Sequence, residues 1–105
     1  MKTFINKKTE ITKAEQVGEE IKTTNLGFAD LALVGLQAPP KEGWSVKDMR
    51  MIFKVIDKLE GLEFDQSVEL TDEEFDQLVK SSNVQWTAMH KDIVAFDDYL
   101  EELKN

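Results

Sequence analysis

Cysteine is absent from this 105-residue sequence, and histidine occurs only once. The chain therefore forms no disulfide, offers no thiolate nucleophile and has no cysteine-ligated zinc site. Its five glycines form neither a G-x-G-x-x-G fingerprint nor a P-loop, and no EF-hand loop is present. We expect no cofactor and no bound metal.

Long apolar runs are also missing. The longest mainly apolar stretch, residues 26–38, includes Asp30 and is far shorter than the roughly 20 residues that span a bilayer. No signal-peptide pattern follows the first eight residues. We therefore expect a cytoplasmic protein without a membrane partner.

Negative charge is what the sequence has in excess. Lys and Arg number 13 against 21 Asp and Glu, for a net charge of −8. Residues 61–105 hold three lysines and twelve acidic residues, so nearly all the acidity lies there. This balance argues against direct nucleic-acid binding. Hydrophobic residues at 41% and charged residues at 32% are typical of one globular domain, which we place over residues 1–105.

Residues 1–24 form the β-rich segment of this domain. Isolated apolar residues among threonines favour short strands, and we expect residues 2–6 to pair with residues 19–23 in a hairpin. A short helix over residues 13–17, capped by Thr12, is the alternative for the connection.

Residues 25–105 form the helical segment. Asn25 is a suitable N-cap for the first helix, Ser45-x-x-Asp48 and Thr71-x-x-Glu74 are capping-box patterns, and Pro39-Pro40 and Gly61 mark helix ends. The expected helices cover residues 26–36, 46–60, 72 to about 82, and 92–103. The fold class is α+β, mostly α: a short N-terminal hairpin or small sheet followed by about four helices.

The apolar periodicity predicts the core. In the second helix, Met49, Ile52, Phe53, Ile56 and Leu59 follow the helical repeat and are expected inward. One core should bury Leu31, Ile52, Ile56, Phe75, Leu78 and Phe96. A β element near Ile5 and Ile21, with Val68–Leu70 alongside, should cover one side.

A second interpretation of the C-terminal part stays open. A series of residues from Val79 to Leu103, apolar except for Ser82, keeps an unbroken 3-4 spacing, so residues 72–103 could form one helix. At about 1.5 Å per residue it would be roughly 48 Å long, too long for a compact monomer, and would imply a coiled-coil oligomer. We favour two helices, although a homo-oligomer is compatible with the sequence.

Candidate chemistry is sparse. His90 and Asp92 could form a catalytic pair only with an activated serine, and no nucleophile elbow is present. We therefore expect no catalytic residue and no enzyme. The candidate residues are instead aromatic and acidic side chains near the C-terminus, which would form a partner-binding surface: Trp86, Asp97, Asp98, Tyr99, Glu101 and Glu102.

Four segments carry a resemblance to a known group of proteins: residues 25–33, 51–60, 68–75 and 91–100. In their layout the chain resembles small proteins of tailed bacteriophages and prophages, generally of unknown function. The resemblance implies a short β N-terminus before three or four helices, with no catalytic residue. It also implies a role in virion assembly or in modulating a host protein, in the host cytoplasm or the virion.

Two functional hypotheses follow. The first is a non-enzymatic interaction protein whose partner is a phage or host protein. The alternative is an acidic nucleic-acid mimic that inhibits a host DNA- or RNA-binding protein, because carboxylates can replace phosphates in a basic groove.

Overall fold

The computed structural model describes residues 1–39, 42–82, 86 and 89–104. The elements in chain order are β1 (Lys2–Ile5), β2 (Lys8–Val17), β3 (Glu20–Gly27), α1 (Phe28–Gln37), α2 (Val46–Leu59), β4 (Ser67–Leu70), α3 (Asp72–Ser82) and α4 (Lys91–Lys104). Helices make up 51% and strands 27% of the described residues. The α+β class is confirmed, but helices dominate less than the sequence predicts.

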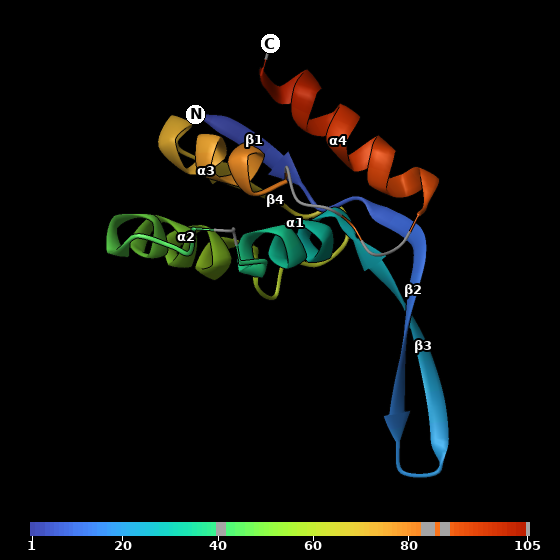
Figure 1. The fold of residues 1–105 in the computed structure, drawn as a ribbon. Helices are drawn as coiled ribbons and strands as arrows, with labels where there is room; N and C mark the ends of the chain where they lie inside the picture. The colour runs from blue at the N-terminus through green and yellow to red at the C-terminus, as the bar shows by residue number, and fades with distance from the viewer. Residues whose placement is uncertain (40–41, 83–85, 87–88, 105) are drawn as a thin grey trace.

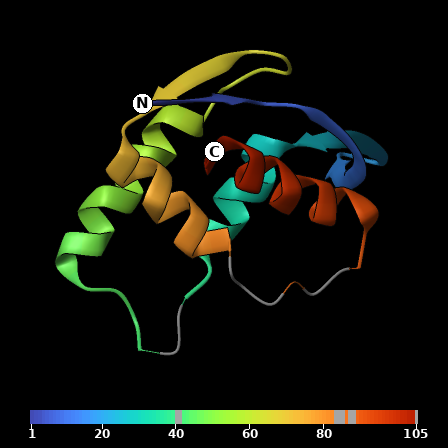
Figure 2. The same cartoon turned by 90° about the horizontal axis from the view of Figure 1, so that it is seen from above.

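The N-terminal strand does not pair with its neighbours in sequence. β1 is antiparallel to β4, with Phe4 opposite Val68, and the two strands run side by side along one side of the helices (Figure 2). The expected pairing of residues 2–6 with 19–23 is therefore wrong. Phe4 and Leu70 are fully buried, whereas Ile21 is 73% exposed. The pairing that buries apolar side chains is the one that forms, and Val68–Leu70 is extended as expected.

β2 and β3 form a separate hairpin that leaves the body of the molecule and points away from the helices (Figure 1). We call its outer part, residues 11–25, the β arm. Val17 pairs with Glu20 across a two-residue turn, in which Gly18 has φ of +65°. Glycine adopts this conformation at little cost, and it begins a turn suited to hairpins. The alternative helix over residues 13–17 is therefore wrong.

α1 begins two residues later than expected. Its N-cap is Gly27, not Asn25, whose side chain instead donates to the carbonyl of Thr9 at 2.9 Å. The cap oxygen comes from Asn6, which accepts the N–H of Ala29 at 2.9 Å. After the last turn Ala38 is extended, as its position before Pro39 requires.

α2 begins at Val46 with Ser45 as its N-cap, as predicted, and the Ser45 hydroxyl accepts the N–H of Asp48 at 3.1 Å. Its buried face is rotated from the expected one: Val55 joins Ile52, Ile56 and Leu59 in the core. Met49 and Phe53 are exposed, so their inward placement is wrong. The periodicity alone did not separate them from the core side, because they lie next to it around the helix.

Two helices complete the core. Thr71 and Glu74 form the predicted capping box at the start of α3. The Glu74 carboxylate accepts the N–H of Thr71 at 2.8 Å, and the Thr71 hydroxyl accepts the N–H of Glu74 at 3.1 Å. α3 ends at Ser82 and α4 begins at Lys91, so the single helix over residues 72–103 is wrong. All six predicted core residues are buried in one cluster, which Phe4, Phe28 and Tyr99 also join. None of the helices in the described ranges is long and apolar enough to cross a bilayer.

Candidate functional site

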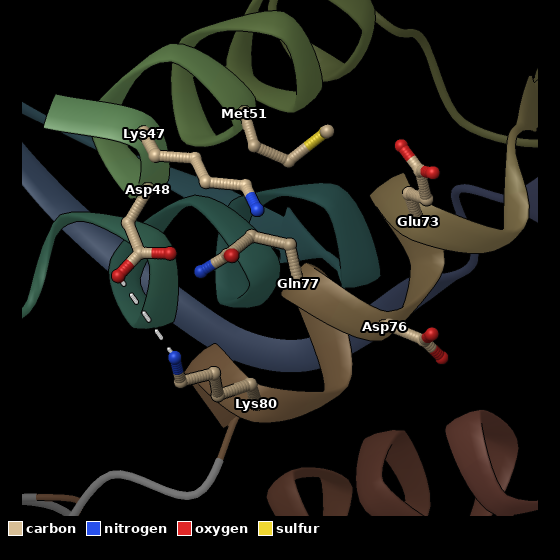
Figure 3. A pocket seen from close by; sticks show the side chains of 7 residues that line it. All are labelled: Lys47, Asp48, Met51, Glu73, Asp76, Gln77 and Lys80. Atoms are coloured by element: carbon tan, nitrogen blue, oxygen red, sulfur yellow. Dashed lines mark ion pairs between the residues drawn. The ribbon is translucent and has the colours of Figure 1, made fainter. Parts of the chain in front are cut away.

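A cleft of about 370 Å³ lies between α2 and α3. Its lining comprises Lys47, Asp48, Met51, Glu73, Asp76, Gln77 and Lys80. Figure 3 shows Lys47 and Met51 of α2 facing Gln77 of α3, with an ion pair across one end. That pair joins Lys80 Nζ and Asp48 Oδ2 at 3.9 Å.

The charges in this cleft largely balance. Two lysines face three carboxylates, and the Lys80 side chain is 71% exposed. A water-accessible pair of this kind contributes little to stability. Across the described part of the chain, no group of three or more His, Asp or Glu side chains could hold a metal ion. The charged side chains of this cleft therefore pair with each other between α2 and α3 and do not form a binding site for a small ligand.

A buried carboxylate lies beside this cleft. Glu74 of α3 accepts hydrogen bonds from Lys58 Nζ at 2.6 Å and from the N–H of Thr71 at 2.8 Å. Burial alone would raise the pKa of Glu74, but the bonds from Lys58 and Thr71 outweigh it and hold the pKa below its ordinary value. Lys58 also donates to the carbonyl of Glu69 at 3.0 Å. This ion pair fastens α2 to the start of α3.

The acidic candidates of the last helix share one environment. Asp97, Asp98, Glu101 and Glu102 of α4 are all exposed. Lys104 pairs with Glu101 at 2.9 Å. Residues three or four positions apart are neighbours on a helix surface, so these carboxylates form a continuous acidic face. We call these four residues the α4 acidic face.

The two aromatic candidates are less exposed than the residues of that face. Tyr99 is buried, and its hydroxyl accepts the N–H of Ile5 at 2.9 Å. Its ring also packs on Phe4 and Phe28. Trp86 is partly buried against the core. Tyr99 is thus a core residue and is not part of the exposed candidate surface.

His90 has a structural contact at the start of α4. Its Nδ1 accepts the backbone N–H of Asp92 at 3.0 Å, and Nδ1 lies 3.8 Å from Asp92 Oδ2. The Asp92 carboxylate also accepts the N–H of Glu10 in β2 at 2.7 Å. Asp92 therefore joins α4 to the hairpin, and His90 contacts Asp92 at the start of the helix.

Sequence reasoning missed an exposed apolar surface on α2. It consists of Val46, Met49 and Phe53 of α2 together with Trp44, which lies two residues before the helix, and we call these four residues the α2 stripe. Val46 is 63% exposed and Phe53 61% exposed. The spacing of residues 46, 49 and 53 places them along one side of the helix. The available signal was an apolar sector wider than one helix can bury.

Comparison with known proteins adds no assignment. No protein-family model matches the chain, and no curated protein or solved structure is detectably similar to it.

Proposed function

We propose that this protein is a non-enzymatic protein–protein interaction protein that binds its partner through the α2 stripe. The observation that carries the proposal is the exposure of Phe53 and Val46 on a side of α2 that adjoins the side forming the core. Single exposed apolar residues are common on protein surfaces. Three of them on one side of a helix, with an exposed Trp two residues before that helix, are typical of an interaction site.

The chemistry of the stripe defines the partner. Trp, Phe and Met are enriched where proteins bury surface against each other. Arg50 and Asp57 are exposed on the same helix, so the apolar centre has a charged rim. A partner with an apolar patch or an amphipathic helix would cover such a surface.

The biological setting remains a prediction. The resemblance to small phage and prophage proteins favours a partner in the phage particle or the host cell. Assembly of the virion and modulation of a host protein both fit a surface of this kind. The protein would then act in the host cytoplasm or in the virion.

The decisive experiment compares two variants at equally exposed apolar positions. Phe53→Ser alters the α2 stripe, and Val94→Ser alters α4, where Val94 is also 61% exposed. Immobilised protein is incubated with bacterial lysate and with disrupted virions. We expect a protein retained by the parent and by Val94→Ser to be lost with Phe53→Ser. Equal retention by both variants would contradict the proposal.

A second candidate function is an acidic nucleic-acid mimic, supported by the four exposed carboxylates of the α4 acidic face. The target would be a host protein with a basic groove. Its binding should weaken steeply with salt and fall with Asp97→Asn combined with Asp98→Asn. Phe53→Ser should leave that binding unchanged, so the two functions are distinguishable.

A further inference from the structure

The β arm has an open edge along β2. Within the described ranges, the sheet that contains β2 has only two strands, and side chains 12–17 are exposed. Nearer the body this edge is covered, because the N–H of Glu10 bonds to Asp92 of α4. Ile11 is partly buried against the core, and from Thr12 to Val17 nothing described covers this edge. A free strand edge is a template for pairing with another strand.

The turn determines which backbone groups face this edge. Val17 and Glu20 flank a two-residue turn, so they form a hydrogen-bonded pair, and such pairs recur at every second residue. Glu15 and Lys13 therefore also bond inward to β3. Thr12, Ala14 and Gln16 direct their N–H and C=O groups outward.

The sequence along this edge is self-complementary. Residues 11–17 read Ile-Thr-Lys-Ala-Glu-Gln-Val. Read in either direction from Ala14, the residues become charged, then polar, then β-branched apolar. Lys13 and Glu15 project from the same face, where their side chains are joined at 3.0 Å.

We propose that two copies of this chain pair through β2, antiparallel, about a two-fold axis at Ala14. The product is a continuous four-stranded sheet in the order β3, β2, β2 of the second copy and β3 of the second copy. Lys13 then lies opposite Glu15 of the second copy and Ile11 opposite its Val17. Ala14 bonds to the second copy's Ala14, and Thr12 to its Gln16.

The register follows from charge and from backbone direction. An axis at Lys13 would place two lysines opposite each other, and an axis at Glu15 two glutamates. Like charges directly opposite are destabilising in a sheet. The axis at Ala14 instead gives two Lys–Glu pairs at non-hydrogen-bonded positions, where side chains approach most closely.

Charge also favours a second copy as the occupant. The paired edge carries one Lys and one Glu and is neutral, in a chain of net charge −8. Pairing through the β arm thus joins two acidic proteins at an uncharged segment. Nucleic acid fits this ribbon poorly, because its tip carries Glu19 and Glu20. The proposal is independent of the α2 stripe and of any heterologous partner.

The test is a charge-swap experiment followed by sedimentation velocity. The parent chain should dimerise with rising concentration. Lys13→Glu should be monomeric because it opposes Glu with Glu, and Glu15→Lys because it opposes Lys with Lys. An equimolar mixture of the two should restore a dimer, since each Glu then faces a Lys. That recovery also shows that both variants are folded.

Two proline variants form a matched pair that tests which backbone edge of the hairpin forms the dimer. Ala14 and Thr23 are cross-strand partners, and the N–H of each faces away from the hairpin. Ala14→Pro removes a donor from the β2 edge and should abolish the dimer, whereas Thr23→Pro alters the β3 edge and should leave it intact. Circular dichroism of each variant confirms the fold. A monomeric parent, a dimer that survives Ala14→Pro, or a mixture that stays monomeric would overturn the proposal.

Discussion

The side-chain oxygen of Asn6 accepts the backbone N–H of Ala29 at 2.9 Å, 23 residues further along the chain. Ala29 lies in the first turn of α1, where backbone N–H groups have no partner within the helix. Gly27, the N-cap, has no side chain to supply one. The Asn6 amide also donates to the carbonyl of Leu62 at 2.8 Å. One buried side chain thus joins the end of β1, the start of α1 and the segment before β4.

We expect Asn6→Ala to lower the free energy of unfolding by about 2–4 kcal/mol, because the buried N–H of Ala29 and the partly buried carbonyl of Leu62 lose their partner. Urea denaturation measures this. Asn25→Ala is the matched control: it removes one partly exposed bond to Thr9 and should cost no more than about 1.5 kcal/mol. If Asn25→Ala were the more destabilising change, the cap of α1 would be assigned to the wrong asparagine.

The two sides of α2 should respond very differently to truncation. Ile56 is buried, so Ile56→Ala should cost about 2–5 kcal/mol through lost burial and a cavity. Phe53→Ala, on the exposed α2 stripe, should change the free energy of unfolding by about 0.5 kcal/mol or less. Chemical denaturation of both variants compares them directly. An unchanged midpoint for Ile56→Ala would show that the core side of α2 is wrongly assigned.

Local signals in the sequence predicted the helices well. Ser45 and Thr71 each carry a cap that operates within three residues, so α2 and α3 begin where the pattern places them. The cap of α1 could not be predicted in this way. Its oxygen comes from Asn6, and only the tertiary fold brings the two segments together.

Strand pairing and the exposed surfaces were harder to predict from the sequence than the helices. β1 pairs with β4 across more than sixty residues, and no local pattern encodes such a contact. The acidic candidates on α4 are exposed, which is also what an ordinary solvated helix surface would show. Tyr99 could not be distinguished from a surface aromatic by spacing alone, because its burial depends on the proximity of Ile5 and Phe4.

Stability should depend on pH through Glu74. The pKa of Glu74 is lowered in the folded protein, so its contribution is fully present above the unfolded value of about 4.3 and is lost as the pH falls through the folded pKa. We expect Glu74→Gln to be less stable than the parent at neutral pH, with the difference shrinking in acid. Urea titrations from pH 7 to pH 3 measure it. Glu73→Gln, at an exposed neighbour, is the control, and a difference that grows in acid would contradict the assignment.

Tyr99→Phe separates a core role from a binding role at one position. The change keeps the ring between Phe4 and Phe28 but removes the hydroxyl that accepts the N–H of Ile5. We expect a loss of about 1–2 kcal/mol in the free energy of unfolding, because that N–H is left without its partner. Partner capture by the folded variant should equal that of the parent. Unchanged stability together with lost capture would instead return Tyr99 to the binding surface.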